Sequence, residues 1–145
     1  MKIIVKEPGK APAIKQTEEK YRTKACKPYI AGEDSDTIVQ FLKLDEKGTL
    51  WMGCDEEGLL KDLPTNFYLH NGFFAERIVG NVVFIRTDYI AGERFFTEEI
   101  YDYETKPLTA EDISFVLSLL DERKQKELKE QNESNPVNPF GSFFG

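Results

Sequence analysis

The chain has 145 residues, of which 40% are hydrophobic and 31% are charged, and its formal net charge is −7 at pH 7. This composition predicts one globular domain with a tail rather than a fibrous or fully disordered chain. No apolar run approaches the roughly 20 residues that a membrane helix needs. The first ten residues, MKIIVKEPGK, lack the apolar region of a signal peptide. We therefore expect a cytoplasmic protein without a membrane segment.

Positive and negative side chains are unevenly distributed along the chain. Residues 1–28 hold 8 Lys or Arg against 3 Glu, whereas the remaining residues hold 11 against 23. The acidic part argues against broad contact with nucleic-acid phosphates, because such contact needs clustered cations. The basic part could bind an anion locally, or it could form the solvated face of a helix beside an acidic body.

Apolar runs separated by turn residues predict two β-hairpins in the first half of the chain. The first covers residues 2–16, with Pro8-Gly9-Lys10 as its turn. The second joins an apolar stretch at 37–44 to another at 50–52. Gly48 supplies the permissive backbone of the turn between them.

Two shorter segments are predicted to be helical. Thr17 can cap a helix that begins at Glu18, and Pro28 should end this helix at about Lys27. Residues 64–72 predict one short helical turn, because proline suits the first position of a helix.

The run GNVVFIR, residues 80–86, is the strongest strand pattern in the chain. Its continuous apolar centre of β-branched and aromatic residues is typical of a strand covered on both faces. The sequence IAGERFFT, residues 90–97, predicts a turn followed by an edge strand. The pentapeptide YIAGE occurs at 29–33 and again at 89–93. We interpret it as the same tight turn used twice before a strand.

Residues 110–130 predict a long C-terminal helix. Thr109 and Asp112 match the capping-box pattern at its start. Two apolar faces follow at helical spacing, Ile113, Val116, Leu117 and Leu120 on one and Phe115 and Leu119 on the other. The second face could form a homodimer contact or pack on loops of the same chain. Glu122 and Lys126 predict an ion pair that would help the polar end of the helix to protrude.

Together these elements predict an α+β domain over residues 1–120. We expect a small antiparallel sheet built from hairpins, packed against one short N-terminal helix and one long C-terminal helix. Residues 121–134 would form a polar helical extension of this domain. Residues 135–145, NPVNPFGSFFG, would form a flexible aromatic tail, because two prolines prevent a regular helix there.

Four landmarks, VKEPGKAP, CDEEGLLKDLPTN, GNVVFI and LTAEDI, follow one another along the chain. In this order the chain resembles a family of short proteins known only as a domain of unknown function, encoded by bacterial phages, plasmids and conjugative elements. The resemblance spans about residues 1–120 and is most specific over 54–66. It departs at Lys27-Pro28, where the family pattern has paired glycines before Tyr29, and after Leu120. It implies a small α+β domain of mobile-element origin in a bacterial host cell, and it implies no chemistry.

No catalytic or metal-binding arrangement is predicted. His70 is the only histidine and lacks partners at a recognisable spacing, so we interpret it as a helix-end or loop residue. Cys54 precedes an acidic turn, which would raise the pKa of its thiol and make it a packing residue. Cys26 is interpreted as a buried helix position. The acidic turns lack the ligand order of an EF-hand loop. We therefore expect no catalytic residue, cofactor or metal.

The main functional hypothesis is a non-enzymatic accessory protein that binds a host or element-encoded protein. Inhibitors of host defence or nucleic-acid enzymes act in this way, because carboxylates can occupy a site made for phosphate. The tail aromatics could dock on a partner's hydrophobic pocket, fold back on the domain or stay disordered. The predicted partner-binding residues are Asp34, Asp36, Asp45, Asp55 and Glu56 in the acidic turns, and Phe140, Phe143 and Phe144 in the tail.

The alternative hypothesis is the capture of a small nucleotide signal. Basic residues would bind the phosphate and an aromatic side chain would stack on the base. The predicted ligand-binding residues are Arg22, Lys24, Arg77, Arg86, Arg94 and Tyr89. Aromatic residues at such positions could equally well fill the core.

Overall fold

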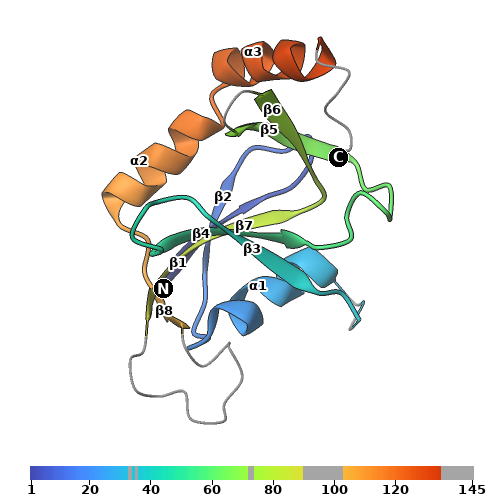
Figure 1. Ribbon diagram of the computed structural model, residues 1–145. Helices are drawn as coiled ribbons and strands as arrows, with labels where there is room; N and C mark the ends of the chain where they lie inside the picture. The colour runs from blue at the N-terminus through green and yellow to red at the C-terminus, as the bar shows by residue number, and fades with distance from the viewer. Residues whose placement is uncertain (33, 35, 72–73, 90–102, 135–145) are drawn as a thin grey trace.

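The computed structural model describes residues 1–32, 34, 36–71, 74–89 and 103–134. The fold is a mixed α+β fold, as predicted (Figure 1). Its elements in chain order are β1 (Lys2–Lys6), β2 (Ala13–Gln16), α1 (Arg22–Ala31), β3 (Val39–Lys43), β4 (Leu50–Asp55), β5 (Thr65–Asn71), β6 (Phe74–Val79), β7 (Val82–Tyr89), β8 (Tyr103–Lys106), α2 (Ala110–Leu119) and α3 (Glu122–Glu133). The predicted edge strand within 90–97 and the aromatic tail lie outside the described residues.

Six strands form an antiparallel sheet in the order β2-β1-β7-β4-β3, with β8 also paired to β7. The two predicted hairpins are confirmed as β1–β2 and β3–β4. Strand β7 lies between the hairpins, with Phe84 opposite Ile4 of β1 and Met52 of β4. Arg86 of β7 is paired on one side with β4 and on the other with β8. Strand β8 therefore lies on the same side of β7 as β1, next to the later residues of β7.

Strand β7 is covered on both faces, which confirms the prediction from its apolar run. Val82, Val83, Phe84 and Ile85 are each 0% exposed. Successive side chains of a strand point to opposite faces. Val82 and Phe84 therefore join the core cluster that includes residues of α2, β5 and β6, whereas Val83 and Ile85 join the cluster that includes residues of α1.

Helix α1 begins later than predicted, because backbone contacts to β1 and β8 hold Thr17 and Tyr21. The Thr17 N–H donates to the Met1 carbonyl (2.9 Å), and the Met1 amino group donates to the Thr17 carbonyl (2.7 Å). The Thr17 hydroxyl accepts from the Glu19 N–H (3.1 Å), which makes a local turn rather than a helix cap. Tyr21 forms a β-bridge with Glu104 of β8. These contacts extend the β1–β2 hairpin and delay the helix to Arg22.

Helix α1 also continues past Pro28, which was wrongly expected to end it. Pro28 is exposed, so the Lys24 carbonyl that loses its helical partner can be hydrated. Beyond the proline, Tyr29 and Ile30 pack against the core cluster under α1. The helix ends at Gly32, whose φ of 60° favours glycine. Residues 29–32 of the first YIAGE copy therefore form the end of a helix, not a turn before a strand.

Strands β5 and β6 form a separate two-stranded sheet that the sequence reasoning missed. The expected helical turn over 64–72 is wrong: β5 pairs with β6 from Thr65 to Asn71. The alternation of buried and exposed side chains explains the strand. Phe67 is 3% exposed and Leu69 packs against the same core cluster, whereas the neighbouring His70 is exposed.

The predicted long C-terminal helix is divided into α2 and α3. The capping box of Thr109 and Asp112 is confirmed at the start of α2. The Asp121 side chain accepts from the Lys124 N–H and caps a new helix, which ends the first one at Leu119. None of the helices within the described residues has the length and apolarity needed to cross a membrane.

Helix α3 packs on the β5–β6 sheet instead of protruding (Figure 1). Leu128 is 6% exposed on its inner face. The Asn132 side chain donates to the Ala75 carbonyl (2.9 Å), and Gln125 forms two hydrogen bonds with the Tyr68 backbone (2.7 and 2.9 Å). The ion pair along the described part of α3 is Arg123–Glu127 (3.9 Å), not the predicted pair of Glu122 and Lys126.

Candidate functional site

Four of the predicted acidic residues gather at one end of the β3–β4 hairpin. Lys61 connects two of them, because its Nζ lies 2.8 Å from Asp55 and 3.6 Å from Asp34. Asp55 is itself buried and accepts from the Glu57 N–H (2.9 Å), so it also shapes the turn after β4. Asp36, whose N–H donates to the Asp34 side chain (3.0 Å), and Glu56 are both exposed.

Three exposed apolar side chains lie beside these carboxylates. Leu60 is 85% exposed, Leu59 is 64% exposed and Ile38 is 58% exposed. The Glu56 N–H donates to the Ile38 carbonyl (2.9 Å), which places Ile38 next to the start of the loop that carries both leucines. We call this region the acidic leucine surface. It comprises Asp34, Asp36, Ile38, Asp55, Glu56, Leu59 and Leu60.

A shallow hollow of about 110 Å³ adjoins the acidic leucine surface. It is lined by Leu59 together with residues of β3, β4 and β6, including Leu42, Glu76 and Arg77. Sequence reasoning missed the exposure of Leu59 and Leu60, two adjacent leucines directly after the polar turn CDEEG.

Asp45, the fifth predicted acidic residue, lies at the opposite end of the hairpin. The ladder from Val39–Asp55 to Lys43–Trp51 separates the two ends by about 13 Å at 3.3 Å per residue. Its carboxylate accepts from the Thr49 N–H (2.9 Å), the Leu50 N–H (3.2 Å) and the Thr49 hydroxyl. Burial acts to raise the pKa of Asp45, but these hydrogen bonds more than offset it and hold the pKa below its usual value. Asp45 therefore stabilises its own turn.

The predicted ligand-binding cations are not brought together. Arg22 is 6% exposed, and its guanidinium lies between the rings of Phe41 (4.2 Å) and Trp51 (4.3 Å). Arg86 donates two hydrogen bonds to Asp112 (2.6 and 3.0 Å). Phe41 and Trp51 pack in the cluster under α1, whereas Asp112 begins α2, so the two arginines serve opposite faces of the main sheet.

The remaining members of that set are also dispersed. Lys24 is exposed on α1. Arg77 lies on β6 and donates to the Thr65 hydroxyl (3.0 Å). Tyr89 is the last residue of β7, and Arg94 lies outside the described residues. The structure therefore offers no shared phosphate site among Arg22, Lys24, Arg77 and Arg86.

The two cysteines occupy buried positions, as expected. Cys26 is 0% exposed on α1, and burial raises the pKa of its thiol far above the usual value. Burial, followed by the charges of Asp55 and Glu76, raises the pKa of Cys54 to about 11. His70, predicted on a helix end or loop, is instead an exposed residue of strand β5. Within the described ranges, no group of three His, Cys, Asp or Glu could hold a metal ion.

We expect both thiols to resist alkylation in the folded protein. At pH 8 the Cys54 thiol, with a pKa of about 11, is almost wholly protonated, and the thiolate is the reactive species. Iodoacetamide at pH 8 should label neither cysteine in buffer and both in 6 M guanidinium chloride, as read by intact mass. Rapid labelling of Cys54 in buffer, at the rate of a free thiol, would contradict the buried environment.

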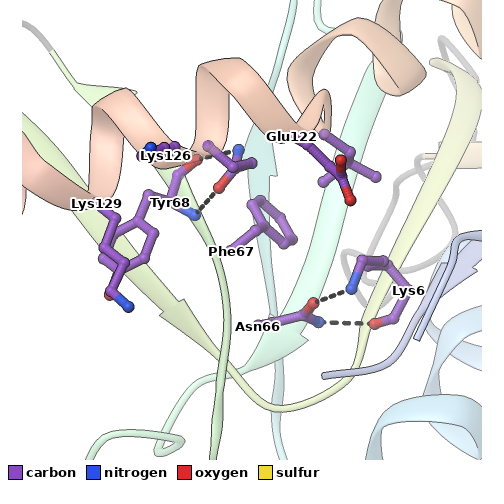
Figure 2. Close-up of a pocket in the computed structure, with 9 residues that line it drawn as sticks. Lys6, Asn66, Phe67, Tyr68, Glu122, Lys126 and Lys129 are labelled. Carbon is purple, nitrogen blue, oxygen red and sulfur yellow. Dashed lines mark hydrogen bonds between the residues drawn. The ribbon is translucent and has the colours of Figure 1, made fainter. Parts of the chain in front are cut away.

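A cavity of about 460 Å³ lies between α3, β5 and the end of β1 (Figure 2). We call it the lysine pocket. Figure 2 shows Phe67 at its centre, with Lys6 and Asn66 on one side and Lys126 and Lys129 of α3 on the other. Its lining residues are Lys6, Asn66, Phe67, Tyr68, Leu120, Glu122, Gln125, Lys126 and Lys129.

Hydrogen bonds hold the walls of the lysine pocket in place. Asn66 donates to the Lys6 and Gly80 carbonyls (2.7 Å each) and accepts from Lys6 Nζ (2.9 Å). Gln125 joins α3 to β5 through the Tyr68 backbone. Sequence reasoning missed this pocket, because Lys6 is separated from Lys126 and Lys129 by more than a hundred residues along the chain.

The comparisons with known proteins give one family and nothing further. No curated protein and no solved structure matches the chain significantly. A family model with the description "Domain of unknown function (DUF3846)" matches residues 1–121. This range contains every described strand together with α1 and α2, and it ends where α3 begins. The chain is therefore a member of the DUF3846 family of domains of unknown function.

Proposed function

We propose that this protein acts by binding a protein partner through the acidic leucine surface. The observation that carries the proposal is the exposure of Ile38, Leu59 and Leu60, each more than half exposed, in and next to a loop that also carries exposed carboxylates. In the setting that the sequence suggests, it is a non-enzymatic accessory protein of a phage or other mobile element, in the cytoplasm of a bacterial host.

The apolar side chains supply the affinity in this proposal. Full burial of one leucine contributes about 1.5–3 kcal/mol, so three such side chains are a substantial driving force for association. Apolar residues surrounded by a polar rim are the usual anatomy of a binding surface. Leu60 is almost fully exposed and is free to enter a pocket on a partner.

The carboxylates define the kind of partner. Asp34, Asp36 and Glu56 are exposed at the same end of the hairpin as the leucines, in a chain whose net charge is −7, so the surface favours a partner with an apolar pocket rimmed by Lys or Arg. Enzymes that handle nucleic acids present such cations to phosphate. An inhibitor of a host defence or nucleic-acid enzyme would use this surface in place of phosphate.

Substitution of Leu60 by Asp tests the proposal with a matched control. Ile14 on β2 is also an exposed apolar side chain (53%), so Ile14→Asp makes the same chemical change outside the surface. We expect Leu60→Asp, but not Ile14→Asp, to remove the partners that the tagged protein retains from host lysate at low salt. Glu56→Lys should weaken the same interactions and reduce their salt dependence.

Two results would count against the surface. Retention of the same partners by Leu60→Asp and Ile14→Asp would show that the leucines are not in the interface. Loss of the partners on deletion of residues 135–145, with no effect of Leu60→Asp, would assign the binding to the tail aromatics Phe140, Phe143 and Phe144. Circular dichroism of each variant should match that of the unaltered protein, because both substituted side chains are exposed.

A further inference from the structure

We infer that the lysine pocket binds a small amphipathic anion, with an apolar body against Tyr68, Leu120 and the small exposed part of Phe67, and a carboxylate or phosphate at Lys6. This site is distinct from the acidic leucine surface and does not depend on the function proposed above.

The size and lining of the cavity fit such a ligand. Its volume of about 460 Å³ lies in the range of about 300–1,000 Å³ that is typical of small-molecule sites. Aromatic and aliphatic side chains form its floor, and polar groups converge at its edges (Figure 2). The side chains of Gln125 and Asn66 form hydrogen bonds with the protein backbone, and Asn66 also accepts from Lys6. These bonds fix the walls of the cavity.

The charge of the lining opposes the charge of the whole chain. Lys6, Lys126 and Lys129 face the cavity with Glu122 as the acidic member of the lining, a local excess of two positive charges in a chain of net charge −7. Among the described residues none of these three lysines forms an ion pair. These lysines are therefore not held in ion pairs, and the one carboxylate of the lining, Glu122, leaves the cavity with a positive excess.

Lys6 is the cation best placed to hold the anionic group. Its Nζ donates to the Glu7 carbonyl (2.8 Å) and to the Asn66 side chain (2.9 Å). An ammonium group has three protons, so one remains for a ligand. Burial removes part of the water around the Lys6 ammonium and lowers its pKa. An anion at this position would restore that solvation.

Fluorescence titration with 1-anilinonaphthalene-8-sulfonate, an aromatic anion, tests the inference on the full-length protein. We expect saturable binding of one molecule, weakened about tenfold by Lys129→Glu or Lys126→Glu, because each replaces a positive charge of the cavity lining with a negative one. Both lysines are exposed, so the fold should not change. Lys124→Glu is the matched control: it makes the same change on the same helix, outside the lining, and should alter affinity by less than about twofold.

Further measurements locate the anionic group and identify its class. Lys6→Met, checked for an unchanged thermal transition, should weaken binding about tenfold, since it removes the nearest charge and keeps the aliphatic stem. Displacement of the dye by adenosine monophosphate would indicate an aromatic phosphate, and displacement by decanoate an acyl carboxylate. Equal dye affinity in the Lys129→Glu and Lys124→Glu variants, absence of saturable binding, or displacement by neither competitor would overturn the inference.

Discussion

Substitution of Phe84 by Ala is expected to lower the free energy of unfolding by about 3–5 kcal/mol. Phe84 is 0% exposed at the centre of β7, between Ile4 and Met52 on the neighbouring strands. Its ring lies 6.0 Å from that of Phe67 on β5, so one side chain joins the main sheet to the β5–β6 sheet. A domain of this size has a total stability of about 5–15 kcal/mol, so the loss would be a large fraction of it.

Urea unfolding followed by circular dichroism measures this effect. Phe115→Ala is the matched control, because Phe115 is 42% exposed on α2 and its truncation should cost less than about 1 kcal/mol. In Phe84→Ala, amide exchange should accelerate in β5 and β6 more than in the β1–β2 hairpin, because the aromatic contact to Phe67 is lost. Equal losses of stability in the two variants would show that Phe84 does not join the two sheets.

Local sequence patterns correctly predicted the elements whose structure is decided by residues close in the sequence. The β7 run could be recognised because a strand buried on both faces needs apolar residues without alternation. The hairpins β1–β2 and β3–β4 were predictable because their turns lie within a few residues of their strands. The capping box at Thr109 and Asp112 is equally local, since its hydrogen bonds span three residues.

The errors arose where a distant partner decides between two local options. Thr17 suits a helix cap, but its backbone is paired with Met1, and Tyr21 is paired with Glu104. Residues 64–72 begin with a proline that suits a helix, but β6 offers a strand to pair with. The break between α2 and α3 was missed because residues that favour a helix, such as Leu, Glu, Arg, Lys and Gln, stand on both sides of Asp121.

The candidate sites show the same division. The acidic turns were predicted to form one carboxylate-rich surface. Asp34, Asp55 and Glu56 do lie near one another, because Lys61 contacts both Asp34 and Asp55. The lysine pocket joins residue 6 to residues 126 and 129, so no local motif could reveal it. The proposed ligand cations failed to converge because strand alternation assigns Arg86 to one face, whereas Arg22 packs over the other.

Substitution of Asp112 by Ala is expected to lower the free energy of unfolding by about 2–3 kcal/mol. The carboxylate accepts two hydrogen bonds from Arg86 of β7 and one from the Thr109 N–H (2.9 Å), so it both caps α2 and attaches this helix to the sheet. Removing one partner of a buried ion pair costs about 3–5 kcal/mol, and the partial exposure of Arg86, 26%, reduces this. Asp121→Ala, which removes only the exposed cap of α3, should cost about 1 kcal/mol.

The pH dependence of the unfolding free energy distinguishes the contribution of the Asp112 charge from that of its neutral hydrogen bonds. Burial acts to raise the pKa of Asp112, but hydrogen bonds from Arg86 and Thr109 more than offset it and hold the pKa below its usual value. A carboxyl whose pKa is lower in the folded state stabilises the fold above its unfolded pKa, about 3.9, and loses this contribution as the pH falls through the folded value. The stability difference between the unaltered protein and Asp112→Asn should therefore be full at pH 7 and shrink below about pH 4. A difference that stays constant from pH 7 to pH 3 would show that the ion pair with Arg86 contributes nothing and that Asp112 acts only through neutral hydrogen bonds.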